Sequence, residues 1–237
     1  MMRLDKYLAE MGVGTRQEVK KQIRQGKVTV NGTVVKAADT KIDETCDEVT
    51  IGGRNISYVS YEYYMLNKPG GVVSATEDRR DTTVIDLIKD KKRKDLFPVG
   101  RLDKDTEGLL LITNDGDLAH RLLAPKKHVD KVYYAKVAGI VTEEDVERFA
   151  QGIDIGTDEE EMTRPAQLDI LKSGEESEIR LTIHEGKFHQ VKRMFQAVKK
   201  EVTYLKRERM GTLCLDEDLK PGEYRLLTEE EIENVRK

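Results

Sequence analysis

The chain has 237 residues, 36% of them charged, and a formal net charge of −4. That length allows one large domain, or a large and a small one, with a proper apolar core. No apolar run approaches the ~18 residues needed to span a bilayer, and the start MMRLDKYLAEMG lacks a secretory apolar stretch, so we expect a cytoplasmic protein without membrane contact.

The N-terminal segment is basic, although the chain as a whole is acidic. Residues 1–36 carry a net charge of +5, which leaves −9 for the rest. Leu4, Leu8 and Met11 recur at helical spacing, and Thr15 with Glu18 forms the capping box of a second helix. An acidic protein with such a segment can still bind phosphate groups through it.

The second helix predicts a buried face at Val19 and Ile23 and an exposed face with three cations, Lys20, Lys21 and Arg24. After it, KVTVNGTVV reads as two short strands around a type I′ turn at Asn31-Gly32. A basic face alone is ordinarily solvated surface. Together with the tight hairpin and the small size of the segment, it favours RNA binding by these cations.

Residues 37–60 are polar, and we expect a small domain over 1–58 and a larger one over 61–237. The larger part predicts strands at YEYYML, GLLLI, VYYAKV, AQLDIL and EIRLTI, and helices at TEEDVERFA, HQVKRMFQAV and TEEEIENVR. Strands and helices alternate irregularly, which favours a mixed α+β fold over a doubly wound sheet.

The stretch GRLDKDTEGLLLITNDG, residues 100–116, contains the first candidate for chemistry. Asp103 lies between Arg101 and Lys104, in a loop that feeds the apolar strand 109–112. A carboxylate between two cations should stay ionised at neutral pH, which suits a nucleophile or a general base. From this stretch alone, a salt bridge between Asp103 and Arg101 is the better interpretation, and Asp105 is a solvated charge.

The second candidate is EGKFHQVKRMF, residues 185–195, where a helix follows a strand. The apolar positions Val191, Met194, Phe195 and Val198 form the buried face of that helix. Lys192 and Arg193 lie off this face and could hold a phosphate or pair with an acid. His184 and His189 are five residues apart, which is not metal-ligand spacing, so each is interpreted as a hydrogen-bonding histidine.

A third stretch, YYMLNKPGG, carries Lys68 in a sequence that fits a plain hairpin turn. The sequence has no GxxxxGK[ST], GxGxxG, HExxH or GxSxG motif, which removes support for nucleotide hydrolases, dehydrogenases, zinc proteases and serine hydrolases. Cys46 and Cys214 lack CxxC spacing, and we expect both to be small packing residues. A cofactor-free enzyme or a binding protein remains.

GRLDKDTEGLLLITNDG resembles the signature of the RsuA/Rlu class of pseudouridine synthases almost residue for residue. The resemblance covers nearly the whole chain: RLDKYLA to VTVNG is similar to an S4 RNA-binding domain, and YYMLNKPGG, KVYYAKV, EGKFHQVKRMF and PGEYRLLTEEEI follow in the family's order. It implies an S4-like domain joined to a catalytic domain with a mixed, largely antiparallel sheet. It also implies RNA as partner and neither a cofactor nor a metal.

By this resemblance Asp103 is the catalytic carboxylate, Arg101 fills the place of a flipped uridine, and Tyr133 stacks on the target base. Lys192 matches the basic residue that pairs with the aspartate, although many relatives carry Arg there. Lys68 and Arg193, like the basic N-terminal helix, are expected to contact RNA.

The finer motifs, with His189 and Lys192, resemble the branch that acts on small-subunit ribosomal RNA or an assembling ribosomal particle. We expect the enzyme to be a monomer. Three alternatives stay open: a large-subunit rRNA synthase, a non-catalytic ribosome-assembly protein, and an RNA glycosidase that releases uracil.

Overall fold

The computed structural model describes residues 1–124, 128–156 and 162–237. It divides into two compact units. The first unit comprises Met1–Glu62 and Lys89–Leu96, and the second comprises Tyr63–Ile88 and Phe97–Lys237. The chain therefore passes between the units three times.

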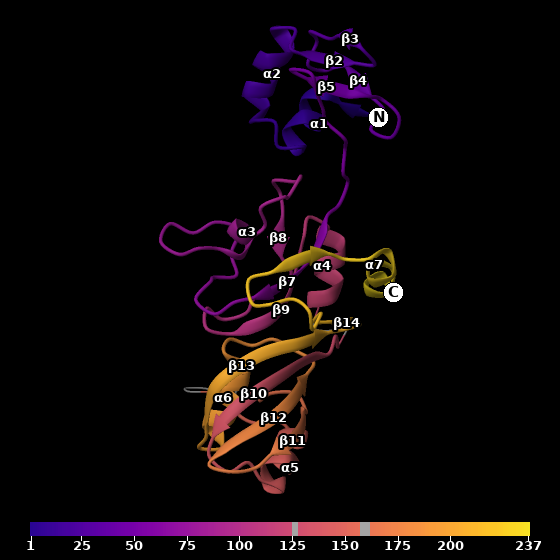
Figure 1. Cartoon of the computed structure of the whole chain (residues 1–237). Helices are drawn as coiled ribbons and strands as arrows, with labels where there is room; N and C mark the ends of the chain where they lie inside the picture. Colours follow the sequence, from indigo (N-terminus) through magenta and orange to yellow (C-terminus); the bar gives the residue numbers. More distant parts are fainter. Residues whose placement is uncertain (125–127, 157–161) are drawn as a thin grey trace. The chain divides into compact units, whose positions relative to one another are not determined.

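The first unit packs two helices, α1 (Leu4–Glu10) and α2 (Arg16–Arg24), on short strands (Figure 1). Strands β1 (Met2–Arg3) and β4 (Lys41–Ile42) pair with each other, and a four-stranded sheet has the order β3-β2-β5-β6, with β2 (Val28–Val30), β3 (Thr33–Val34), β5 (Val49–Ile51) and β6 (Arg54–Asn55). The predicted capping box is confirmed, because Thr15 and Glu18 bond each other's backbone N–H. The predicted hairpin is confirmed too: Asn31 and Gly32 both have positive φ, 51° and 77°.

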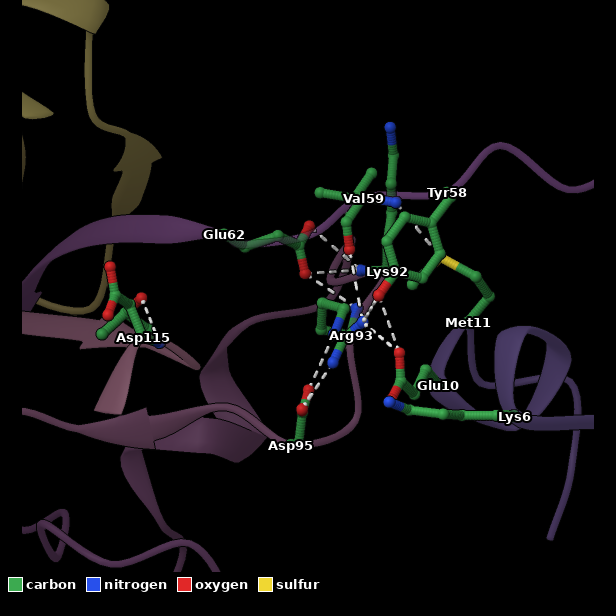
Figure 2. Close-up of polar contacts among 11 residues, drawn as sticks. Lys6, Glu10, Met11, Tyr58, Val59, Glu62, Lys92, Arg93, Asp95 and Asp115 are labelled. Carbon is green, nitrogen blue, oxygen red and sulfur yellow. Dashed lines mark hydrogen bonds and ion pairs between the residues drawn. The ribbon is translucent and has the colours of Figure 1, made fainter. Parts of the chain in front are cut away.

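The segment Lys89–Leu96 belongs to the first unit although it lies between two parts of the second in sequence. Figure 2 shows its anchor, Arg93, whose side chain is 6% exposed. Arg93 Nη1 donates to Glu10 Oε2 at 3.1 Å, and Nη2 donates to Asp95 Oδ2 at 2.6 Å. The Glu62 carboxylate accepts the backbone N–H groups of Lys92 and Arg93. This segment is thus fixed by both its side chains and its backbone.

The second unit is built on a nine-stranded sheet with the order β11-β12-β10-β13-β9-β7-β15, to which β14 adds beside β13 and β8 beside β9. The bounds of its strands are β7 (Tyr63–Lys68), β8 (Phe97–Pro98), β9 (Glu107–Thr113), β10 (Lys131–Ala138), β11 (Gln167–Lys172), β12 (Glu176–Ile183), β13 (Glu201–Met210), β14 (Leu213–Cys214) and β15 (Tyr224–Leu226). The pairing of β9 with β13 is parallel, and the other pairings in this sheet are antiparallel.

The parallel junction joins the two halves of the sheet and depends on Gly108. Its φ is +100°, and a Cβ at this position would collide with the backbone of Arg207. Only glycine permits both the dihedral and the close approach. The junction brings the start of β9, next to the Asp103 loop, against the middle of β13.

The helices of the second unit are α3 (Val84–Leu87), α4 (Gly116–Leu123), α5 (Glu143–Gln151), α6 (Gln190–Ala197) and α7 (Glu229–Arg236). Leu118 and Leu122 of α4 pack with Leu109 and Leu111 of β9, and Phe149 of α5 packs on Phe195 of α6 with ring centroids 5.0 Å apart. The predicted apolar face of α6 is confirmed as buried.

The α+β class with a mostly antiparallel sheet is confirmed. The expectation for the cysteines is wrong: Cys46 and Cys214 are both exposed, and in β14 the neighbouring Leu213 takes the buried face while Cys214 points to the opposite one. Within the described residues, no helix has the length and apolar character to cross a membrane.

Candidate active site

Asp103 lies in the loop between β8 and β9, and neighbouring segments hold that loop on two sides. Ser74 Oγ donates to the carbonyl of Leu102 at 2.8 Å and accepts the N–H of the same residue at 3.1 Å. The N–H of Gly71 donates to the Lys104 carbonyl at 2.7 Å, and that of Thr106 donates to the Asp103 carbonyl at 3.1 Å. The carboxylate is therefore presented from a backbone with little freedom, as reaction geometry demands.

Lys68, the last residue of β7, adds a further support to the Asp103 loop. Its side chain is fully buried, and its ammonium donates to the carbonyls of Pro69, Lys104 and Thr106 at 3.0, 3.2 and 2.8 Å. Burial lowers the pKa of Lys68 to about 8. The expected contact of Lys68 with RNA is wrong, because all three donors of the buried ammonium are used, two by the Asp103 loop and one by the Pro69 carbonyl.

Lys192, in the first turn of α6, is the cation closest to Asp103. Its Nζ is 3.3 Å from Asp103 Oδ2 and 2.6 Å from Asp105 Oδ1. Burial opposes the charged form of Lys192, but the hydrogen bond to Asp105 and the charge of Asp103 outweigh it and raise its pKa. Asp105 is exposed, as expected of a solvated charge, yet its hydrogen bond with Lys192 lowers its own pKa.

His189 supplies a second contact to the same carboxylate, with Nε2 3.5 Å from Asp103 Oδ1. The residue adopts the left-handed conformation, φ 48°, at the N-cap of α6. Its ring stacks on the exposed Phe188 ring, with centroids 3.8 Å apart. Asp103 is thus paired with Lys192 and His189, and the salt bridge to Arg101 that the local sequence favoured is not among the ion pairs of the described residues.

These groups surround a cleft of 780 Å³ in the second unit. The volume suits a nucleotide-sized ligand. Asp103, Arg101, Tyr133 and Lys192 all line it, so the structure brings four of the predicted residues together. Tyr133 is 7% exposed, while Arg101 is exposed at the surface. Six Lys/Arg and two Asp/Glu side chains line the cleft, which therefore favours an anionic ligand despite the acidic chain.

Arg193 is not among the residues that line the cleft. Its Nη1 donates to the Phe188 carbonyl at 3.2 Å, and its Nη2 donates to the Ile155 carbonyl. Its guanidinium braces the turn that carries Phe188 and His189, and the expected contact of Arg193 with RNA stays a prediction. Within α2, Lys21 and Arg24 are exposed, whereas Lys20 is half-buried and lies 3.7 Å from Asp5.

Sequence reasoning missed several groups around the cleft. Ser74, Lys131 and Arg207 line it, the last two from β10 and β13. A serine in a loop gives no local signal, and a charged residue in an alternating strand reads as solvent-facing. Among the described residues, no cluster of three or more His, Cys, Asp or Glu side chains could hold a metal ion.

The chain matches two known families along its length. Residues 62–197 match the family described as RNA pseudouridylate synthase, and residues 2–49 match the S4 domain. A solved structure titled "Crystal structure of pseudouridylate synthase" is 40% identical, with a TM-score of 0.69, and the match covers 99% of this chain and 100% of that one.

Full-length relatives agree with this assignment. An uncharacterised RNA pseudouridine synthase of Bacillus subtilis is 49% identical over 98% of this chain and 97% of its own. Proteins named ribosomal small subunit pseudouridine synthase A are 45% identical in Vibrio vulnificus, over 100% of both chains, and 41% identical in Escherichia coli K12, over 99% of this chain and 100% of that one. The chain belongs to the RNA pseudouridylate synthase family and carries an N-terminal S4 domain.

Proposed function

We propose that this enzyme converts one uridine of small-subunit ribosomal RNA to pseudouridine, with Asp103 as the catalytic carboxylate. The observation that carries the proposal is the position of Asp103: it lies in a nucleotide-sized, positively charged cleft, on a braced loop, 3.3 Å from Lys192. The small-subunit target is supported by the names of full-length relatives from Vibrio and Escherichia.

The reaction breaks the N1–C1′ bond of uridine, turns the uracil and forms a C5–C1′ bond, so no atom is gained or lost. Asp103 either attacks C1′ as a nucleophile or removes the C2′ proton. Both routes need an ionised carboxylate at a fixed position. Lys192 and His189 contact that carboxylate at 3.3 and 3.5 Å, and the tethers to Ser74 and Lys68 keep the loop in place.

The target base must leave the RNA stack before Asp103 can reach its sugar. Flipping costs a few kcal/mol. We assign Arg101, exposed at the cleft, to the space that the base vacates, and Tyr133, nearly buried within it, to stacking on the flipped base. Lys21 and Arg24 of the S4 domain are assigned to the phosphate backbone, because both are exposed on a basic helix.

The test is a map of pseudouridine in both ribosomal RNAs from cells with and without the gene, by carbodiimide labelling and primer extension. We expect one stop in small-subunit RNA to vanish on deletion, to return with the wild type and to stay absent with Asp103→Asn. In vitro, Asp103→Asn should lower turnover by at least about 100-fold and leave RNA affinity within a few fold.

Other outcomes of this experiment would point to the alternatives. A stop that vanishes only from large-subunit RNA contradicts the substrate but keeps the chemistry. Free uracil released from the RNA would make the enzyme a glycosidase. Unchanged maps in both RNAs, with RNA binding intact, would indicate a binding protein instead.

A further inference from the structure

Two cations, Arg207 and Lys131, line the catalytic cleft from its floor, although they are 2% and 8% exposed. Arg207 lies on β13, directly opposite Tyr133 in the register of β10 and β13. Opposed residues of an antiparallel pair share one face of the sheet and lie in side-chain contact range. Arg207 and Tyr133 accordingly line the same cleft, with the Arg207 guanidinium directed from β13 towards Leu109 of β9.

The hydrogen bonding of Arg207 is incomplete. Its Nε donates to the Leu109 carbonyl at 2.8 Å, whereas Nη2 is buried without a hydrogen-bond partner in the described part of the chain. No carboxylate in residues 1–124, 128–156 or 162–237 forms an ion pair with it. A buried charge without a full set of partners costs free energy of folding, so Arg207 is present although it destabilises the fold.

Lys131 shows the same excess of positive charge. Its ammonium donates to the Val129 carbonyl at 3.0 Å. Burial first, and the charge of Arg207 second, lower the pKa of Lys131, while Asp130 and Glu185 oppose this shift. This part of the cleft therefore holds two neighbouring cations and, in Nη2 of Arg207, a buried donor without an acceptor among the described residues.

Depth separates this site from the cations at the mouth of the cleft. Arg101 and Lys104 are exposed, as phosphate contacts usually are, and Lys104 also pairs with Asp81 at 2.7 Å. Arg207 and Lys131 are buried like Tyr133, so the part of a bound nucleotide that we expect them to meet is the base. The groups on a uracil edge that accept hydrogen bonds are its O2 and O4 atoms.

We propose that Arg207, with Lys131 beside it, binds a carbonyl oxygen of the flipped uracil and stabilises the uracil anion formed during the reaction. This inference rests on the proposed function. When the N1–C1′ bond breaks, its electron pair stays on N1 and spreads to O2 and O4, while C1′ bonds to Asp103 or Asp103 takes the C2′ proton. C5 then bonds to C1′ as the bond between C1′ and the Asp103 oxygen breaks or, on the second route, as Asp103 returns its proton to C2′; the C5 proton is lost, N1 gains a proton and the Asp103 carboxylate is regenerated. A fixed cationic donor at the carbonyl oxygen strengthens as that charge develops.

The test compares Arg207→Gln and Arg207→Lys with Arg180→Gln, which removes a surface cation of the same sheet that pairs with Glu208. Under single-turnover conditions with excess enzyme, we expect Arg207→Gln to lower the rate on ribosomal RNA by roughly 100-fold, with RNA affinity changed less than about three-fold. Arg207→Lys should be intermediate, because it keeps the charge but not the planar fork. Arg180→Gln should match the wild type.

The discriminating readout uses RNA that carries 5-fluorouridine at the target position, with loss of the 5-fluorouridine followed by mass spectrometry. Fluorine withdraws electrons and stabilises the departing base anion, so the rate loss caused by Arg207→Gln should shrink by about ten-fold. An equal loss on both RNAs would make Arg207 merely structural and overturn the inference.

Thermal unfolding checks that each variant folds, and Arg207→Lys carries the same comparison if the glutamine variant does not. A wild type that forms no pseudouridine in any ribosomal RNA contradicts the proposed function itself; an active wild type with an unaffected Arg207→Gln contradicts this inference alone.

Discussion

Two lysines act on Asp103 in different ways. Lys192 contacts the carboxylate through space, but it shares its charge with Asp105, which lies closer. Lys68 forms no ion pair with the carboxylate; it donates to the Lys104 and Thr106 carbonyls of the loop that carries Asp103, and to the carbonyl of Pro69. Lys192 therefore pairs directly with the reacting group, whereas Lys68 affects its position. An ammonium bonds several carbonyls at once with three rotatable donors, which an arginine fork does less well.

The burial of Lys68 predicts a pH dependence of stability. Its pKa is lowered to about 8 in the folded chain and is ~10.4 when unfolded, so between these values the unfolded chain binds more protons. Stability from this group is therefore gained as pH rises through that window, on the order of 2–3 kcal/mol. In urea titrations, we expect the unfolding free energy of the wild type to rise relative to that of Lys68→Met between pH 8 and pH 10. Parallel curves for the two proteins would contradict it.

At the scale of elements, the segment Lys89–Leu96 shows how a short loop completes a domain. Arg93 contacts α1 through Glu10, the segment after β6 through Tyr58 and Val59, and its own loop through Asp95. Because the guanidinium is 6% exposed, removing it leaves Glu10 and the Val59 carbonyl with fewer partners in a poorly solvated site.

We expect Arg93→Met to destabilise the first unit locally by about 2 kcal/mol. Amide hydrogen exchange of α1 should then become roughly 30-fold faster, while β9 of the second unit stays protected. Arg54→Met, which removes an exposed cation of the same unit, is the matched control and should leave the exchange of α1 unchanged. Unaltered protection of α1 in Arg93→Met would show that the segment adds nothing to the unit.

Local signals in the sequence predicted most elements, because capping boxes, the Asn31-Gly32 turn and the apolar face of α6 are each set by residues close in sequence. The contacts that sequence reasoning missed are set by partners far along the chain. Lys68 is placed next to the Asp103 loop by the pairing of β7 with β9, opposite Gly108. Arg207 is placed at the cleft by the parallel pairing of β13 with β9, also opposite Gly108. Neither pairing leaves a local pattern, so a turn lysine and a strand arginine read as surface charges.

At the scale of the whole molecule, the charge is divided unevenly. Residues 1–36 carry +5 and the remainder −9, while the cleft in the acidic part is lined by six cations and two acids. The proposed RNA contacts therefore fall on two regions of positive charge in an otherwise largely acidic chain. Such a distribution gives salt-dependent affinity without a basic protein overall.

The S4 contribution to RNA binding is best tested by removing charge, not by removing the domain. Deletion of residues 1–58 would strip Arg93 of Glu10 and Tyr58 and expose a buried cation, which confounds the measurement. Lys21→Gln with Arg24→Gln removes two exposed charges from α2 and leaves the apolar face of the helix intact. Each cation that meets a phosphate releases counterions, so the slope of log affinity against log salt should fall by about 1.5.

A double variant on the second unit controls for net charge in that experiment. Lys172→Gln with Arg180→Gln also removes two positive charges, but from surface ion pairs with Glu178 and Glu208 outside the cleft. Its binding slope should stay within about 0.3 of the wild type, because ions paired on the protein release no counterions from RNA. If the wild type and the α2 variant had equal slopes, Lys21 and Arg24 would not be part of the RNA interface. If both double variants lowered the slope equally, net charge and not the helix would govern affinity.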